Sequence, residues 1–207
     1  MVILSFCADE YQELRSHIRI PFVVYDGYFE NNGRICNLLI DDRDGGRQVG
    51  EHFRRLGHRK VLCIADNHIC MDQRRYEGLC EGLGFQADFL EIPMRKQKRE
   101  RYYQERLDRL RQYTAVFAVS DYYAVDLMRF LQRSGLRVPE DVSIAGFDGS
   151  VLCQQVLPAL TSVRQDPARR ARTAVELLMR MKREPDFSGD VLMDVQLIPR
   201  DSTRPVK

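Results

Sequence analysis

Short apolar runs alternate with stretches of helical periodicity along nearly the whole chain. The runs within 60–66, 114–121 and 142–147 are continuous in apolar residues, which is typical of parallel strands buried on both faces. Between such runs, residues 45–56 carry apolar side chains at helical spacing, and Gly57 follows as a C-terminal glycine should. Strand then helix, repeated, predicts an α/β fold with parallel sheets and right-handed crossovers.

The pattern predicts the following elements in full. Strands are expected at 2–6, 21–25, 36–40, 60–66, 86–93, 114–121 and 142–147, with one final strand within 191–203. Helices are expected at 9–18, 45–56, 74–83, 97–112 and 122–134, and a last one is marked by Ala171, Ala174, Val175, Leu178 and Met179.

Acidic residues follow several of the predicted strands. Four strands end in Asp26, Asp41, Asp66 and Asp148, and a fifth ends in Ser120-Asp121. The carboxyl ends of parallel strands share one edge of a sheet, which is where ligands bind in such folds. Aspartate is also a good turn and N-cap residue, so any one of these can be structural. The set as a whole predicts a polar ligand-binding cleft.

Composition narrows the classes of function. The chain is 44% hydrophobic and 30% charged, with a net charge of +2, which is ordinary for a globular protein and too small to argue for nucleic-acid binding by itself. No apolar stretch approaches the roughly 18 residues that a membrane span needs. The six cysteines show no CxxC pairing, and the four histidines form no ligand motif. We therefore expect reduced thiols, a cytoplasmic protein, no metal and no cofactor.

Three local motifs allow a second interpretation. The basic stretch 94–113 contains Tyr102 and Tyr103, as nucleic-acid sites do, but its spacing favours one amphipathic helix with a solvated charged face. Gly45-Gly46 at a helix start could cradle an anion, yet no GxGxxG or Walker lysine accompanies it. His68 near Cys70 could form a catalytic pair, although no nucleophile elbow surrounds them.

Several segments resemble LacI/GalR-family regulators. They are "DDRDGGRQVGEHFRRLGHRKVLCIAD", "RRYEGLCEGLGF", "TAVFAVSDYYAVDLMRFLQRSGLRVPEDVSIAGFDG", "PALTSVRQD" and "LIPRDST". The match runs in register from about Val2 to Thr203. It implies a periplasmic-binding-protein-like type I fold, an α/β architecture of two Rossmann-like lobes with parallel sheets and a small effector between them.

The resemblance also implies an incomplete N-terminal lobe. Its first β-α-β-α, a hinge helix and the DNA-binding helix-turn-helix would lie outside this chain. The expected partial N-terminal lobe comprises 1–42 and 161–188, and the C-terminal lobe comprises 43–160 and 189–207.

The resemblance assigns residues to the site. The expected effector contacts are Asp26, Arg75, Ser120, Asp148 and Gln165. Ser120 stands where the family usually has Asn, and Gly27 where an Arg often follows the aspartate. Arg74 competes with Arg75, and Gln165 can equally be an exposed linker residue. Asp41 has a hinge role or a ligand contact, and Asp121 either caps the helix that begins at Tyr122 or contacts ligand.

The resemblance further implies a homodimer and a regulatory function. Interface candidates are Tyr123, Leu127, Val151 and Leu152. The expected partners are a small polar effector such as a sugar, a second copy of the chain, and operator DNA through the missing domain, with no membrane. Two rival classes are a periplasmic-type sugar-binding protein and a small Rossmann-like enzyme using His68 and Cys70. Since no residue set supplies a nucleophile, base and oxyanion donor together, we expect no enzymatic activity.

Overall fold

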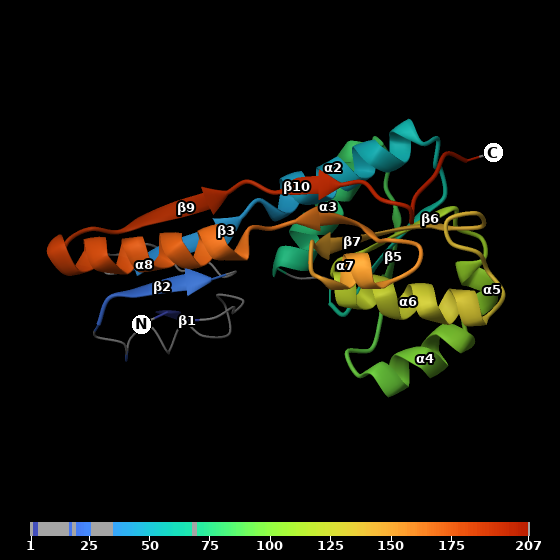
Figure 1. Ribbon diagram of the computed structural model, residues 1–207, viewed down its shortest axis with the longest axis horizontal. Coiled ribbons are helices and arrows are strands. Elements are labelled where there is room, and N and C mark those ends of the chain that lie inside the picture. Colours follow the sequence, from blue (N-terminus) through green and yellow to red (C-terminus); the bar gives the residue numbers. More distant parts are fainter. Residues whose placement is uncertain (1, 4–16, 18–19, 26–34, 68–69, 207) are drawn as a thin grey trace. The chain divides into compact units, whose positions relative to one another are not determined.

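The computed structural model describes residues 2–3, 17, 20–25, 35–67 and 70–206 (Figure 1). They fall into two compact units. Unit 1 comprises 1–41 and 165–195, and unit 2 comprises 42–164 and 196–207.

Unit 1 contains a parallel four-stranded sheet in the order β1-β2-β3-β9. Its strands are β1 (Val2–Ile3), β2 (Phe22–Tyr25), β3 (Ile35–Ile40) and β9 (Gly189–Met193). The helix α8 (Pro167–Arg183) lies along this sheet (Figure 1). It buries Arg170, Ala174, Leu177 and Met181. The predicted apolar stripe was partly wrong, because Val175 and Met179 lie on the exposed side of a helix that carries apolar residues on two faces.

Unit 2 contains a six-stranded sheet in the order β10-β8-β7-β6-β4-β5. Its strands are β4 (Val61–Ala65), β5 (Asp88–Glu91), β6 (Ala115–Ala118), β7 (Ser143–Asp148), β8 (Thr161–Arg164) and β10 (Gln196–Ile198). All neighbours are parallel except β10, which pairs antiparallel with β8. Every residue of β4 and β6 is buried, as the continuous apolar runs predict.

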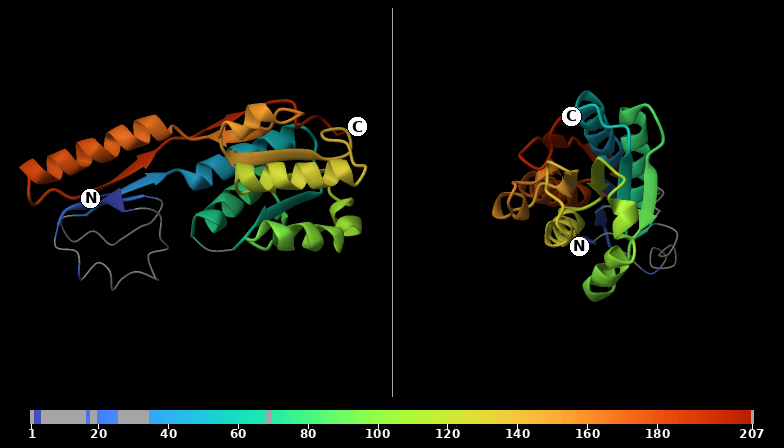
Figure 2. Two further views of the ribbon diagram at one scale, coloured as in Figure 1. Left: turned by 60° about the horizontal axis from the view of Figure 1, so that its bottom comes forward. Right: turned by 90° about the vertical axis from the view of Figure 1, so that its right-hand side faces the viewer.

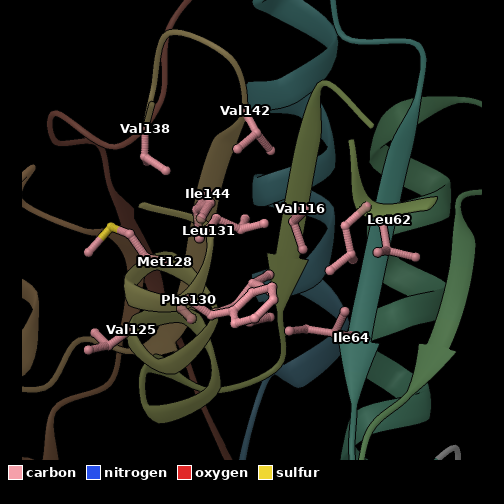
Figure 3. Packing of buried hydrophobic residues seen from close by; sticks show 14 of the residues in the cluster. Leu62, Ile64, Val116, Val125, Met128, Phe130, Leu131, Val138, Val142 and Ile144 are labelled. Carbon is pink, nitrogen blue, oxygen red and sulfur yellow. The ribbon is translucent and has the colours of Figure 1, made fainter. Parts of the chain in front are cut away.

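Helices cover both faces of this sheet (Figure 2). They are α2 (Asp42–Arg55), α3 (Cys70–Leu83), α4 (Lys96–Gln104), α5 (Leu107–Leu110), α6 (Asp121–Arg133) and α7 (Leu152–Gln155). On the α6 face, apolar side chains from the helix and the sheet form one buried cluster, in which Leu131 lies beside Ile144 (Figure 3). Leu127 is fully buried in this cluster.

Glycines bring α2 and α3 into close backbone contact. A Cβ added at Gly46 would lie 2.0 Å from the carbonyl oxygen of Arg75, and one at Gly78 would lie 1.9 Å from the carbonyl oxygen of Arg43. Real Cβ atoms essentially never approach so closely, so only glycine allows this packing. The structure therefore gives Gly46 a packing role, in place of the anion-binding role that Gly45-Gly46 allowed.

Three expectations about the elements need correction. The predicted helix over 97–112 divides into α4 and α5, because the backbone of Arg106, at φ = −120° and ψ = 13°, leaves the helical conformation between them. The single final strand is two strands, β9 and β10, in different sheets. The short helix α7 was not predicted as a helix.

The predicted lobe boundaries are displaced as well. Strand β8 pairs with β7 and β10, so 161–164 belong to unit 2, and β9 pairs with β3, so 189–193 belong to unit 1. The chain therefore leaves unit 2 after Arg164 and returns to it at Gln196.

One cysteine differs from the expectation of reduced thiols. Cys70 is disulfide-bonded, whereas Cys36, Cys63, Cys80 and Cys153 are free.

Candidate functional site

Arg75 is a buried cation of unit 2 whose guanidinium is held by three contacts. It lies in the second turn of α3 and is only 8% exposed, whereas its competitor Arg74 is exposed. Nε donates to Oδ1 of Asp42 at 2.7 Å, and Nη1 donates to the carbonyl oxygen of Val119 at 2.6 Å. The guanidinium carbon lies 3.9 Å from the centre of the Phe147 ring. These three contacts fix the plane of the guanidinium before any ligand binds.

Neighbouring carboxylates stabilise the positive charge of Arg75. Burial by itself would lower the pKa of Arg75, but the carboxylates of Asp42 and Asp148 outweigh burial and raise it. Asp42 was missed as a functional residue, because the sequence argument assigned the strand end to its neighbour Asp41. Its position in the first turn of α2, facing an arginine 33 residues away, is set by the packing of α2 on α3.

Asp148 ends β7, as predicted, and its backbone is strained. It has φ = 116°, and the following Gly149 has φ = 66°. A non-glycine residue in this region costs of order 1–3 kcal/mol, and such strain gathers at functional sites. Its register partner in β8 is Arg164, an exposed residue. The strand end therefore places a carboxylate at the same edge of the sheet as Arg75.

Ser120, and not Asp121, caps the helix α6. Ser120 is the N-cap of α6, and its Oγ accepts from the backbone N–H of Tyr123 at 3.3 Å. Asp121 is the first residue of the helix and is buried. Its carboxylate accepts from the Ser150 N–H at 2.7 Å, the Cys153 thiol at 3.1 Å and the Ser162 hydroxyl at 2.5 Å. Asp121 therefore ties α6 to the segment after β7 and to β8, which is a structural role.

Asp66 and Asp72 are two further carboxylates near the end of β4, and they interact electrostatically. Asp66 directly follows the strand, and Asp72 is in the first turn of α3, with its side chain 13% exposed. Burial, followed by repulsion from Asp66 and Asp42, raises the pKa of Asp72 to about 6, against the attraction of Arg75. Arg75 Nη1 is 3.9 Å from Oδ1 of Asp72.

Tyr123 connects this pair to α4. Burial, and then the charge of Asp66 and a hydrogen bond to it, raise the pKa of Tyr123 to about 12. The Tyr123 ring centre is 4.9 Å from the guanidinium carbon of Arg99, a buried residue whose Nε donates to Asp126 at 2.9 Å. Sequence reasoning missed Arg99, because nothing in the charged run 94–113 distinguishes it from its solvated neighbours.

The expected contacts in unit 1 stay predictions. Asp26 lies outside the described residues. The backbone N–H of Asp41 donates to the carbonyl oxygen of Met193 at 2.9 Å, and Oε1 of Gln165 accepts from Arg170 at 3.4 Å. His68, half of the catalytic pair considered above, also lies outside the described residues.

The interface candidates separate into two groups. Leu127 is buried within its own unit, and Tyr123 is engaged by Asp66 and Arg99. The assignment of Leu127 is corrected, because its side chain is fully buried inside its own unit, whereas Tyr123 is partly exposed and stays a prediction. Val151 is 74% exposed beside α7, and Leu152 is partly buried against the core cluster.

The described residues contain no group of three or more His, Cys, Asp or Glu side chains that could hold a metal ion. None of their helices has the length and apolar character needed to cross a membrane.

Comparison with known proteins identifies the family. A family model described as "Periplasmic binding protein-like domain" matches residues 51–203. The chain belongs to this family. The fold class predicted from the sequence is thereby confirmed.

Curated relatives and solved structures agree with this assignment. The chain is 26% identical over 225 residues to the HTH-type transcriptional repressor PurR of Vibrio atlanticus, a match covering 98% of this chain and 64% of PurR. It is 31% identical over 177 residues to the HTH-type transcriptional regulator CelR of Thermobifida fusca, covering 82% of this chain and 52% of CelR. A LacI family regulator from Enterococcus faecalis V583, solved with bound ribose, has 30% identity and a TM-score of 0.85, covering 100% of this chain and 78% of that one.

These matches confirm the LacI/GalR resemblance and place the chain among the effector-binding domains of LacI-type regulators. The relatives are regulators of transcription and not enzymes. The chain spans 64% of the length of the PurR repressor that it matches.

Proposed function

We propose that this chain binds a small polar effector, and that the bound effector changes the operator affinity of a DNA-binding segment joined to it. The observation that carries the proposal is Arg75, a buried guanidinium fixed by Asp42, Val119 and Phe147 at the sheet edge where Asp148 ends β7. An arginine held in this way presents its remaining donors to a ligand without further loss of side-chain entropy.

A sugar is the favoured class of effector. Carboxylates such as that of Asp148 accept hydrogen bonds from hydroxyl groups, and an arginine donates to hydroxyl oxygens. The E. faecalis LacI family structure holds ribose, which supports the same class of ligand here. In this proposal Ser120, Asp26 and Gln165 add further contacts, and the protein acts in the cytoplasm.

The proposed mechanism is a shift between conformations. A ligand that contacts one conformation more strongly than another biases the equilibrium towards it. A coupling of ~1–3 kcal/mol between effector and operator would change operator affinity roughly 5- to 150-fold.

We also propose a homodimer that uses the surface around α7. Val151 and Leu157 are 74% and 87% exposed, and large apolar side chains gathered on a surface mark sites of association. A two-fold interface would bury the same patch on both copies.

The function is tested with matched arginine variants. The 207-residue chain is screened by thermal shift against neutral sugars, amino sugars, sugar phosphates and nucleosides. The best ligand is then titrated against the Arg75→Gln and Arg74→Gln variants. We expect Arg75→Gln to lose binding at least ~100-fold, since hydrogen bonds to a charged group are worth ~1.5–3 kcal/mol each, and Arg74→Gln to bind normally.

Two results would refute this proposal. One is the absence of a shift with every class of ligand. The other is an equal loss of affinity in both arginine variants. The regulatory step is tested in the protein that joins this chain to its DNA-binding segment, where a flat operator affinity across the effector titration would exclude the switch.

A further inference from the structure

Unit 2 contains a hollow of about 210 Å³ at the edge of its sheet opposite the candidate site. Residues within 59–61, 85–88 and 112–113 line it, and these segments precede or begin the parallel strands β4, β5 and β6. The hollow therefore lies at the amino edge of the sheet, whereas Arg75 and Asp148 lie at the carboxyl edge. The five residues of β4 separate the two edges by roughly 17 Å, so one small ligand cannot reach both.

Hydrogen bonds between the three segments fix the walls of this hollow. The carbonyl oxygen of Lys60 accepts from the backbone N–H of Thr114 at 2.9 Å. Tyr113 is only 8% exposed, and its hydroxyl donates to Oδ2 of Asp88 at 2.6 Å. Because the folded chain holds these walls in place, a ligand that enters has less conformational entropy to remove.

Two neighbouring cations line the hollow. Arg59 and Lys60 are both exposed, and no carboxylate of the described residues forms an ion pair with either. Other exposed arginines differ in this respect, since Arg43, Arg133 and Arg137 each pair with a carboxylate. The charges of Arg59 and Lys60 are thus available to an anion that enters the hollow.

The carboxylate in the hollow, that of Asp88, has partners of its own. Tyr113 donates to it, and Arg109 interacts electrostatically with both Tyr113 and Asp88. A carboxylate has two acceptor oxygens, so Asp88 can also accept from a hydroxyl group of a ligand. The amides of Gln86 and Gln112 line the hollow as well, and an amide both donates and accepts.

We propose that this hollow is a second binding site, for a small phosphate monoester whose phosphate lies between Arg59 and Lys60. A phosphate monoester carries a charge of about −1.5 to −2 at pH 7, which matches two cations better than a single carboxylate does, and arginine binds phosphate oxygens in pairs. The hydroxyl groups of the ester contact Asp88 and the two glutamine amides.

The volume sets the size of the ligand. Sites for drug-sized molecules measure ~300–1,000 Å³, so a hollow of about 210 Å³ suits a glycerol or sugar phosphate better than a nucleotide. This site is separate from the candidate site at the carboxyl edge and does not depend on the proposed function.

The test compares phosphate esters with their neutral and inorganic counterparts. Calorimetry of the 207-residue chain measures glycerol 3-phosphate and glucose 6-phosphate against glycerol, glucose, inorganic phosphate and sulfate, at one ionic strength because salt screens exposed charges. At least one ester should bind ~10-fold or more tightly than its neutral counterpart and than either inorganic anion. Amide chemical shifts in NMR spectra should change at Lys60, Phe85 and Gln112.

Variants then locate the phosphate. Arg59→Gln and Lys60→Gln replace exposed side chains, and each should weaken the ester ~10-fold, since hydrogen bonds to charged groups are the strong ones. Arg129→Gln removes an exposed arginine of α6 and should leave the affinity for the ester unchanged. Arg59→Gln should also leave binding of the effector at Arg75 unchanged.

Four results would overturn the second site without touching the effector function. The first is that no ester binds, and the second is that inorganic phosphate or sulfate binds as tightly as the esters. The third is an equal loss of affinity in Arg59→Gln and Arg129→Gln. The fourth is an ester that shifts the amides of Asp66 and Asp148 and loses affinity in Arg75→Gln but not in Arg59→Gln, because that ester occupies the candidate site.

Discussion

Asp72→Asn should stabilise the folded protein at neutral pH, although it removes a side chain from the candidate site. The pKa of Asp72 is raised from 3.8 to about 6 in the folded state, first by burial and then by Asp66 and Asp42. A raised pKa means that the folded state disfavours the ionised form. The stability that Asp72 contributes below pH 3.8 is therefore lost as the pH rises through about 6.

The magnitude follows from the two pKa values. At about 1.4 kcal/mol for each pH unit between them, ionisation of Asp72 destabilises the folded state by up to about 3 kcal/mol. The variant avoids this penalty but loses a favourable charge in the first turn of α3, which is worth ~0.3–1 kcal/mol. We therefore expect a net gain of about 2 kcal/mol at pH 7.5 and almost none at pH 4.

The assay is urea unfolding followed by circular dichroism at pH 7.5 and pH 4, with each variant compared with the unsubstituted chain at the same pH. The control, Asp108→Asn, removes an exposed carboxylate and should stay within ~0.5 kcal/mol at both pH values. If Asp72→Asn destabilises the protein at pH 7.5, or shifts stability equally at both pH values, the argument from electrostatic strain is refuted. A variant that is more stable but binds ligand less well would show stability sacrificed to function.

Three further predictions concern packing, pH and assembly. Gly46→Ala should lower the free energy of unfolding in urea by ~3 kcal/mol or more, because its Cβ would lie 2.0 Å from the Arg75 carbonyl oxygen. The control is Gly189→Ala, whose Cβ would meet its nearest atom at 3.9 Å. Equal effects of the two substitutions would contradict the packing argument. Burial, followed by the charge of Arg55, lowers the pKa of His52 to about 4, so stability present above pH 6.5 is lost as the pH falls towards 4. In the unsubstituted chain the free energy of unfolding should fall between pH 7.5 and pH 5, and His52→Gln should make that fall smaller by about 2 kcal/mol. If the fall is the same in the variant, protonation of His52 is not its cause. Val151→Asp should convert dimers to monomers in sedimentation experiments, since it places a charge in the proposed apolar interface, and an unaltered sedimentation coefficient would rule that interface out.

The sequence by itself determined the fold class and the edge of the sheet where polar groups gather. Strands β4, β6 and β7 are continuous apolar runs, and the residue that follows or ends a parallel strand must lie at its carboxyl edge, so Asp66, Ser120 and Asp148 could be placed there from chain order. Arg75 was also found from the sequence, through a family motif and not through periodicity.

Only the tertiary structure decided which of these groups act on one another. Asp42 meets Arg75 because glycines let α2 and α3 approach to backbone contact, and Asp121 is occupied by Ser150, Cys153 and Ser162, which are distant in sequence. Periodicity could not choose between the two apolar faces of α8, since that choice depends on what packs against the helix. Local pattern specifies where a side chain can point, whereas burial, ion pairing and raised or lowered pKa values come from neighbours that the chain brings together only on folding.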